Sequence, residues 1–476
     1  MPKGYRERRY LSIVHPRSQA LLNDLLSRQW STIERWVSRS VFTFDRVSIV
    51  AGERRATAEP QFILHNAHKE SIASVAKWIL QTDITRFYPT IYTHSIAWAA
   101  HGKETYKRNP KRFNGGLADQ LDVAVRKCNR DQTIGIPIGP DSSWIVAEII
   151  SSYVDTNVQA ATGLSTSEAD RMQDDWVVGN SSLEEAEKRL SAIVRAYQKL
   201  GLDINGRKTA ISHIRDVDHP TWRARILPLS QGSRMQGERL AEFLRYALAL
   251  QSEYPSEPVL AYAFAVLEGV KFRGRDIPQL ESFIARAVAV DPRVIDRACI
   301  LYINLHHEGF KLDLARLKRR FVPLVEDALE AGEAFEAIWT LHLFRGLRIS
   351  LDGTRVAELS AASDNPSVCL VLLDMEAEGL VTSLPRRQWL RRISASKLDD
   401  PIWLLAYEGV RHKWLPDPGK KLQRSAFLKP MFQRNVVFYD PRKNVPNRVS
   451  RRRRRLAQRR SQWNVVLTQL FGYGAP

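Results

Sequence analysis

The sequence has little cysteine and lacks a long hydrophobic run. Its three cysteines, Cys128, Cys299 and Cys369, form no CxxC pair and leave an odd number, so neither a disulfide framework nor a zinc knuckle is supported. No stretch of 18 or more apolar residues occurs, and the N-terminal MPKGYRERRYLSIVHP lacks the apolar segment of a signal peptide. These absences predict a cytoplasmic protein without a membrane partner.

Acidic residues are scarce near the C-terminal end. Residues 411–476 contain 17 Lys and Arg against 2 Asp, and this balance accounts for 15 of the 19 net positive charges of the chain. Aromatic residues lie between these cations, and clustered arginine with interleaved rings binds nucleic acid without regard to its sequence. We therefore predict a nucleic-acid-binding segment, with a solubilising basic tail or a targeting signal as alternatives. The cations expected to bind are Arg451, Arg452, Arg453, Arg454 and Arg455.

The first half of the chain has mixed helix and strand signals. At 476 residues the chain is too long for one ordinary core, and its hydrophobic content of 44% can fill two or three. A helix is predicted over 182–201, because Ser182 and Glu185 form a capping box and Gly201 ends the apolar spacing. Strand, helix and strand in this order predict a compact α/β unit. The predicted strands are residues 38–44, 77–84, 174–179 and 211–214.

From about residue 235 to 415 the strand signals fade. Segments such as GERLAEFLRYALALQ and PIWLLAYEGVRHKWL have helical apolar spacing, and most are followed closely by Gly, Pro or Asp. Their lengths and short breaks predict paired helices stacked as a solenoid without a strict repeat. A compact helical bundle is the alternative.

Two adjacent carboxylates stand out in this basic chain. Asp174 and Asp175 lie in RMQDDWVVG, whereas the other pair, Asp399 and Asp400, has no surroundings that indicate chemistry. Asp83 ends an apolar, strand-like run in TDITRFYPTI. Carboxylates from a strand end and a hairpin can hold two divalent cations about 3.5 to 4 Å apart, which suits in-line phosphoryl transfer. Bound Mg²⁺ would turn their repulsion, about 4 kcal/mol at 4 Å, into attraction. The alternative for Asp83 is an ordinary strand-ending aspartate.

Further polar and glycine-rich segments accompany these carboxylates. GIPIGPDSS predicts a loop where backbone approaches a nucleotide closely, followed by a helix capped by Ser142 or Ser143. Lys208 is expected on a turn, where its ammonium can meet a triphosphate or protonate the leaving pyrophosphate. A plain turn and a solvated lysine are the alternatives. His65 and His68 fit a helix face as metal ligands, but no third ligand is evident, so a structural role is favoured.

Four segments in this order resemble the reverse transcriptase family. TDITRFYPTI is similar to its motif A, GIPIGPDSS to motif B, RMQDDWV to motif C and LGLDINGRKT to motif D. RRYLSIVHPRSQ, FYPTIYTHSIAWAAHGK and the long helical second half resemble the bacterial abortive-infection and defence-associated members. The resemblance implies fingers and palm over residues 1–225, a helical-repeat (HEAT-like) domain in place of a thumb over 235–415, and antiphage activity. The charge count adds a basic segment over 416–476.

The resemblance also assigns roles to individual residues. Asp83, Asp174 and Asp175 become the ligands of two Mg²⁺ ions, and Lys208 becomes the motif D lysine. Tyr88, with Phe87 beside it, takes the place of the steric gate that excludes a ribose 2′-OH. Gly139 matches the motif B glycine. Arg54 and Arg55 are expected to contact the triphosphate. The sequence departs from the family pattern at Met172, Gln173 and Ile138.

Three functions follow from this reading. The first is a DNA polymerase that uses dNTPs and Mg²⁺ to copy RNA, with a dedicated noncoding RNA as partner. The second uses the same site to add dNTPs without a template, primed by a protein hydroxyl. The third is a catalytically idle palm that binds nucleic acid through the basic segment. The resemblance is also compatible with a homo-oligomer, for which the sequence locates no interface.

Overall fold

The computed structural model describes residues 1–3, 7–50, 56–57, 61–217, 221–230, 235–443, 445, 447–448 and 457. The chain divides into two compact units. The sheet unit is Leu11–His219 with Ala457–Pro476, and the helical unit is Met1–Tyr10 with Pro220–Leu456. The boundaries inferred from the sequence differ in two places: the first ten residues belong with the helices, and residues 416–443 continue the helical unit. No helix in the described part of the chain is long and apolar enough to span a membrane.

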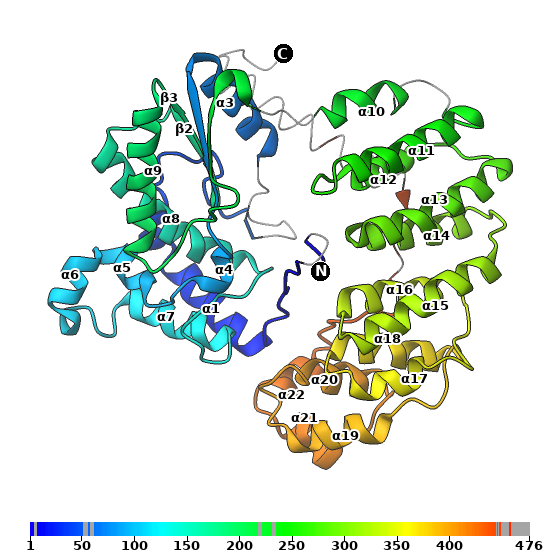
Figure 1. The fold of residues 1–476 in the computed structure, drawn as a ribbon. Coiled ribbons are helices and arrows are strands. Elements are labelled where there is room, and N and C mark those ends of the chain that lie inside the picture. Colours follow the sequence, from blue (N-terminus) through cyan, green and yellow to red (C-terminus); the bar gives the residue numbers. More distant parts are fainter. Residues whose placement is uncertain are drawn as a thin grey trace. The chain divides into compact units, whose positions relative to one another are not determined.

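The sheet unit contains one antiparallel sheet of four strands in the order β2-β3-β1-β4. Figure 1 labels two of these strands, β2 and β3. Leu80 of β1 lies opposite Val178 of β3 and Ile211 of β4. Met172 pairs with Asp175, so β2 and β3 form a hairpin with a two-residue turn. The strands are β1 (Trp78–Thr82), β2 (Ala169–Met172), β3 (Asp175–Asn180) and β4 (Ala210–His213).

Successive side chains of a strand point to opposite faces of the sheet, and here both faces carry apolar side chains. Helices therefore cover both faces. Ile79 and Val177 form a small apolar cluster with Ile72 of α3 (Phe62–Val75). Leu80 and Val178 belong to the main core of the sheet unit, to which α8 (Asp141–Thr162) and α9 (Leu183–Gln198) also contribute. The other helices of this unit are α1 (Pro16–Arg28), α2 (Trp30–Val37), α4 (Phe87–Thr90), α5 (Ser95–His101), α6 (Lys103–Arg108) and α7 (Leu117–Cys128).

The predicted serine cap of α9 is confirmed, whereas the Glu185 carboxylate bonds one residue earlier than in the predicted capping box. The Ser182 hydroxyl accepts a hydrogen bond from the Glu185 N–H at 3.1 Å, and the Glu185 carboxylate accepts one from the Ser181 N–H at 2.7 Å. Three of the predicted strands are confirmed as β1, β3 and β4. The coarse fold class, a small antiparallel sheet with helices followed by a long helical part, is therefore present.

Two local predictions are wrong. Residues 38–44 are not a strand: the Ser40 hydroxyl bonds to Asp155, and the Phe42 carbonyl accepts one hydrogen bond from the Arg171 N–H at 2.7 Å. Neither serine caps α8, which begins at Asp141 with Pro140 in the capping position. Ser142 and Ser143 are buried within its first turn instead.

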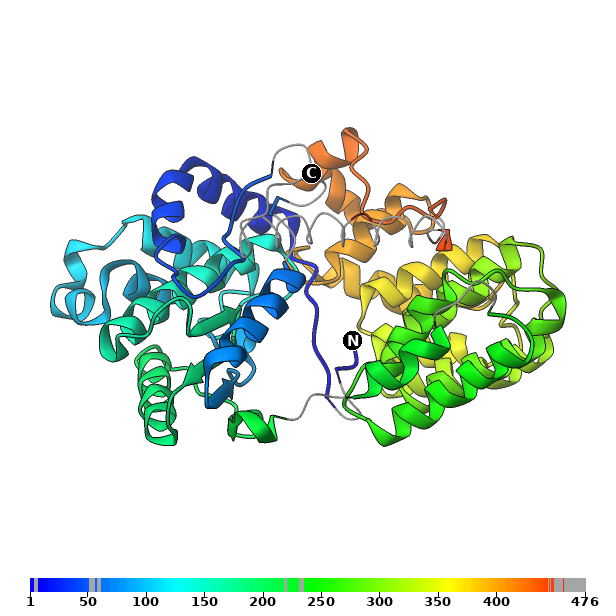
Figure 2. The same cartoon turned by 90° about the horizontal axis from the view of Figure 1, so that it is seen from above.

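In the helical unit, helices contact their near neighbours along the chain. α14 packs against α16, α16 against α18, and α18 against α20. Figure 1 shows them stacked in chain order, and Figure 2 shows the green and yellow helices side by side from another direction. This nearest-neighbour packing is typical of stacked helical repeats. The helices are α10 (Trp222–Ser230), α11 (Glu238–Glu253), α12 (Val259–Leu267), α13 (Ile277–Val290), α14 (Ile295–His307), α15 (Leu314–Glu330), α16 (Ala334–Gly346), α17 (Val356–Leu359), α18 (Pro366–Ala377), α19 (Arg386–Ala395), α20 (Trp403–Arg411), α21 (Lys421–Arg424) and α22 (Leu428–Gln433).

Candidate active site

The three predicted carboxylates lie together at one end of the sheet. Asp83 directly follows β1, whose last residue, Thr82, pairs with Trp176 of β3. Asp175 precedes Trp176 at the start of β3, and Asp174 lies in the turn between β2 and β3. The antiparallel pairing of β1 with β3 thus places Asp83 beside the hairpin. Asp83 is 6% exposed, while Asp174 and Asp175 are half-buried.

The proximity of these carboxylates perturbs the protonation of Asp174. Burial, a hydrogen bond with the Asp83 carboxyl group and the negative charges of Asp83 and Asp175 together raise the pKa of Asp174 to about 8. A hydrogen bond between two carboxyl groups requires a proton on one of them. In the absence of a cation, the pair therefore retains a proton under conditions where an ordinary aspartate is ionised.

Lys208 completes this cluster. Its ammonium group forms an ion pair with the Asp83 carboxylate. The loop before Lys208 is attached to the end of β1, since the Asn205 N–H donates to the Asp83 carbonyl at 2.6 Å and the Thr85 N–H to the Asp203 carbonyl at 2.9 Å. Burial alone would lower the pKa of Lys208, but its hydrogen bond with Asp83 and the nearby negative charges raise it. Lys208 is therefore a cation here, with its side chain 49% exposed.

The donor chemistry of this cluster suits magnesium. Among the described residues, no three His, Cys, Asp or Glu side chains already surround one point in metal-binding geometry. Asp83 is engaged by Lys208 and by Asp174 instead. The Lys208 ammonium and the proton shared by Asp83 and Asp174 show that the oxygens of this cluster attract positive charge. Carboxylate oxygens are also the hard ligands that Mg²⁺ prefers. Asp83, Asp174 and Asp175 are the residues that would hold it.

The predicted gate region adjoins the glycine-rich loop. The Ile136 N–H donates to the Tyr88 carbonyl at 3.0 Å, which attaches the loop to α4. Gly135 has a φ of +87°, and a Cβ there would lie 3.1 Å from the Pro89 carbonyl oxygen. Gly139 has a φ of +130°, which side-chain-bearing residues rarely adopt. Both glycines are therefore required by the backbone of this loop.

Tyr88 and Phe87 differ in their environments. Tyr88 is half-buried, whereas Phe87 is 3% exposed and belongs to the core of the sheet unit. Their rings meet edge to face with centroids 5.7 Å apart. Phe87 is thus a core residue that packs against the more exposed ring of Tyr88.

The two histidines of α3 bond to a buried aspartate of β2. His65 Nδ1 lies 2.8 Å from Asp170 Oδ1, and His68 Nδ1 lies 3.4 Å from the same oxygen. His65 Nε2 is 3.1 Å from Asp45 Oδ2, which is ion-pair distance without hydrogen-bond alignment. These contacts attach α3 to β2 and support a structural role for both histidines.

Arg171 was missed by the sequence reasoning. It is a fully buried residue of β2, and its guanidinium bonds to Glu148 and Asp155 of α8, to Ser40 and to the carbonyl of Gln173 in the hairpin turn. The sequence contained one signal for it, an arginine inside a segment whose neighbours are core residues. A buried arginine requires specific charged partners, so such a residue indicates a buried ion pair.

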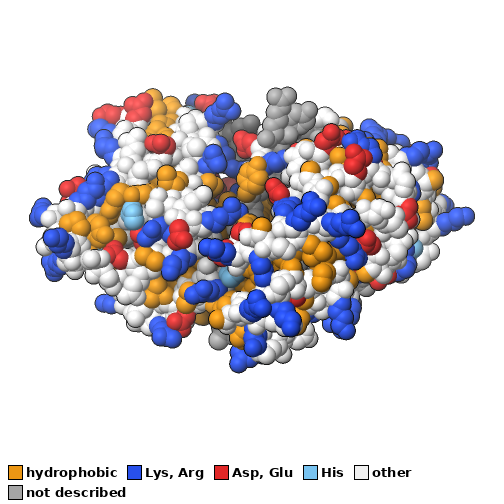
Figure 3. All heavy atoms as spheres, turned by 90° about the horizontal axis from the view of Figure 1, so that it is seen from below, with side chains coloured by type: hydrophobic (Ala, Val, Ile, Leu, Met, Phe, Trp, Pro, Cys, Tyr) orange, Lys and Arg blue, Asp and Glu red, His pale blue; other side chains and the backbone are white. Residues whose placement is uncertain are grey.

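The basic residues expected to bind nucleic acid are only partly described. Arg54, Arg55 and Arg451–Arg455 lie outside the described residues. Within 411–443, Phe438 is 41% exposed, whereas Phe427, Phe432 and Tyr439 pack against the helical core. Figure 3 looks at the side on which α19, α21 and α22 lie, and Lys and Arg side chains are interspersed there with hydrophobic ones. The exposed cations of the segment are Lys413, Lys420, Arg424, Lys429, Arg434, Arg442 and Lys443.

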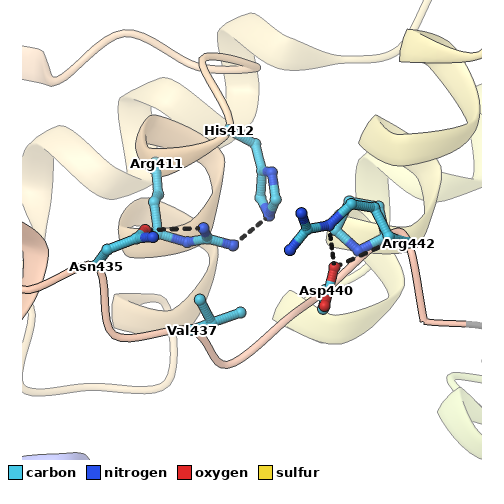
Figure 4. A pocket seen from close by; sticks show the side chains of 7 residues that line it. Arg411, His412, Asn435, Val437, Asp440 and Arg442 are labelled. Atoms are coloured by element: carbon cyan, nitrogen blue, oxygen red, sulfur yellow. Dashed lines mark hydrogen bonds and ion pairs between the residues drawn. The ribbon is translucent and has the colours of Figure 1, made fainter.

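A cavity of about 290 Å³ opens in the same segment (Figure 4). Arg411 Nε donates to Glu408 at 2.7 Å, and Arg442 Nε donates to Asp440 at 3.1 Å. Both arginines of the cavity are thus paired with carboxylates, which makes it a weak phosphate site. The residues that line it are Arg411, His412, Asn435, Val437, Asp440, Pro441 and Arg442.

The carboxylate cluster of the sheet unit is therefore the candidate active site, since it combines convergent ionisable groups, perturbed pKa values and an adjoining glycine-rich loop. Comparison of the chain with protein-family models and with curated proteins gives no match.

Proposed function

We propose that this protein is a magnesium-dependent nucleotidyltransferase of the reverse transcriptase type, which adds dNTPs to a DNA strand. The observation that carries the proposal is the convergence of Asp83, at the end of β1, with the β2–β3 hairpin that holds Asp174 and Asp175. The Lys208 ammonium forms an ion pair with Asp83 at the same place. A strand end and a hairpin that bring three carboxylates together provide the oxygen ligands that phosphoryl transfer requires. The motif order along the chain supports the same assignment.

In this proposal each group of the site has a defined task. Bound Mg²⁺ would stabilise the charge that develops on the attacking and leaving oxygens. Asp83, Asp174 and Asp175 hold the metal. Lys208 exchanges its contact with Asp83 for the triphosphate and donates its proton to the departing pyrophosphate. Tyr88 excludes the ribose 2′-OH by contact with its ring.

The surrounding fold would serve template and product. In the proposed assignment, residues 11–217 provide fingers and palm, and the stacked helices of the helical unit take the place of a thumb. The exposed cations within 411–443 would hold a nucleic acid through its phosphates. An RNA partner that serves as template in antiphage defence is the substrate expected from the resemblance.

The test measures incorporation of each dNTP by the purified full-length protein with Mg²⁺, before and after treatment with RNase. Asp174→Asn removes one ligand, and Asp399→Asn is the matched control because it alters the exposed aspartate pair of the chain. We expect incorporation by the wild type and the control and none by Asp174→Asn. The asparagine should not destabilise the fold, because its amide can donate a hydrogen bond to the Asp83 carboxylate as the protonated Asp174 does.

The outcomes separate the candidate functions. Product that depends on intact RNA supports copying of an RNA template, whereas product that survives RNase supports untemplated addition by the same site. Equal incorporation by the wild type and Asp174→Asn would refute the assignment of the active site. Nucleic-acid binding without incorporation under any condition would support an idle palm.

A further inference from the structure

Arg171 is a buried cation located three residues before Asp174. We propose that Arg171 is a positioning residue, which fixes the peptide ahead of Asp174 and thereby orients the Asp174 carboxylate toward Asp83. This inference rests on the proposed function, because it gives the metal-binding hairpin a dedicated support. It concerns a residue that would touch neither metal nor nucleotide.

The guanidinium of Arg171 connects the hairpin turn to α8. Nη1 donates to the Gln173 carbonyl at 2.7 Å. Nε donates to Asp155 at 2.7 Å, and Nη2 donates to Glu148 at 2.6 Å. Glu148 and Asp155 are separated by two helical turns and therefore lie on the same side of α8. The two carboxylates hold the guanidinium at both edges, so the direction of its bond to Gln173 is fixed.

The turn needs such support because of its backbone. Gln173 has a φ of +59°, in the left-handed region that residues with a side chain rarely adopt. Its carbonyl carbon is bonded to the Asp174 nitrogen, so rotation of that peptide would redirect the Asp174 side chain. The Arg171 bond holds this carbonyl on the α8 side. Charge-assisted hydrogen bonds of this kind are shorter and stronger than bonds between neutral groups.

The contact between Arg171 and α8 also connects the carboxylate hairpin to the glycine-rich loop. α8 begins at Asp141, directly after the loop that contains Gly135 and Gly139, and it contacts α9 and α5 along its length. Through Arg171, this helix also holds the metal-binding turn. The nucleotide loop and the carboxylate hairpin are thus attached to a single rigid element, as precise sites require.

The chain offers a matched control in Arg189. This residue of α9 is also buried, and its Nη1 donates to the Gly179 carbonyl of β3 at 2.7 Å. Its Nη2 pairs with Glu168 at 2.8 Å. Gly179 lies near the opposite end of β3 from Asp175. Both arginines therefore join a helix to a backbone carbonyl of the hairpin, but only Arg171 does so beside the carboxylates.

The experiment compares Arg171→Lys, Arg189→Lys and Asp174→Asn with the wild type as full-length proteins. Mn²⁺ binding is measured by calorimetry, and incorporation of dNTPs is measured as a function of Mg²⁺ concentration. Lysine keeps the charge but cannot bond to two carboxylates and a carbonyl in the fixed geometry of arginine. We expect Arg171→Lys to weaken the Mn²⁺ site and to raise the Mg²⁺ concentration for half-maximal rate about tenfold or more, with Arg189→Lys within about twofold of the wild type.

The design separates loss of position from loss of stability. Thermal unfolding of each variant shows whether it folds, and Glu148→Gln replaces Arg171→Lys if the latter does not, because it weakens the grip on Arg171 while leaving the arginine in place. The positioning role is overturned if Arg171→Lys binds Mn²⁺ as the wild type does, or if Arg189→Lys weakens binding equally. If the wild type and Asp174→Asn bind Mn²⁺ alike, the proposed metal site itself is refuted, and the role of Arg171 with it.

Discussion

Replacing His65 should lower the free energy of unfolding of the sheet unit at low pH and have less effect at high pH. His65 is fully buried between Asp170, at 2.8 Å, and Asp45, at 3.1 Å. Burial alone would lower the pKa of His65, but its hydrogen bond with Asp170, its close contact with Asp45 and the negative charges of both aspartates raise it to about 9. His65 is therefore a cation at neutral pH, held in the contact between α3 and β2.

The raised pKa sets the size and sign of the effect. An unfolded histidine titrates near 6.5, so a pKa of about 9 in the folded state corresponds to about 3 kcal/mol of stability. This stability is fully present below pH 6.5, where histidine is charged in both states. It is lost as the pH rises toward 9, because the folded state then holds a proton that the unfolded state has released. The slope over this window is about −1.4 kcal/mol per pH unit.

The assay compares wild type and His65→Gln between pH 6 and pH 9.5. Hydrogen exchange of peptides that cover β2 and β3 reports the free energy of opening of the sheet unit alone, which matters because the helical unit can unfold separately. We expect the variant to be less stable at pH 6 and the difference to shrink by about 3 kcal/mol by pH 9.5. Exchange at the His65 ring carbon, followed by mass spectrometry, gives its pKa directly.

His342→Gln is the control for this prediction. Burial and the charge of Arg345 together lower the pKa of His342 to about 4, so His342 is neutral in both states above pH 7. Its replacement should therefore change stability by an amount that stays constant from pH 7.5 to pH 9.5. A difference between wild type and His65→Gln that is equally constant, or a His65 pKa below 7, would refute the reasoning.

Three further predictions concern the active site and its partner. Tyr88→Val should admit ribonucleotides and reduce the preference for dNTPs over NTPs, measured as a ratio of kcat/KM, by about tenfold or more; an unchanged ratio would remove its role as a gate. Lys208→Ala should slow incorporation by about 10² to 10⁴ with the metal site retained, and an unchanged rate would exclude proton donation by this residue. Reversing the charges of Arg424, Lys429 and Arg434 should weaken binding of single-stranded nucleic acid and flatten its salt dependence, by about 0.7 per lost phosphate contact. Unaltered salt dependence would show that these cations do not meet phosphate.

Local signals predicted the elements that carry the carboxylates. The capping serine and glutamate of α9 form hydrogen bonds to backbone groups no more than four residues away, so the sequence alone predicts them. β1 is a short apolar run followed by Asp83, and β3 is a short apolar run that begins at Asp175. This pattern suggested that Asp83 and the hairpin can meet. Lys208 was also placed correctly on a turn, although its ion pair with Asp83 depends on pairing between β1 and β4.

Features decided by tertiary contacts were not predictable. β2 contains ADRM, whose two charged residues conceal a strand because both are buried and matched by partners from other elements. Asp170 is paired with α3, and Arg171 with α8. Residues 38–44 have strand composition, yet their polar groups bond to that arginine and to its partners. In each case the partner lies more than ten positions away along the chain, and the spacing of residues in the sequence does not predict contacts at that separation.

The two aspartate pairs of the chain show why adjacency alone is a weak signal and burial a strong one. Asp399 is exposed, and Asp400 accepts a hydrogen bond from the Ile402 N–H at 3.0 Å, so water and backbone satisfy that pair. Asp174 and Asp175 instead meet Asp83, where the Lys208 ammonium and the proton held by the Asp83 and Asp174 pair offset part of the negative charge. A site that served stability alone would be improved by a neutral residue here, because neighbouring carboxylates repel one another and burial makes their ionisation costly. A bound divalent cation would remove that repulsion, which is the physical reason to propose catalysis rather than a structural role for this end of the sheet.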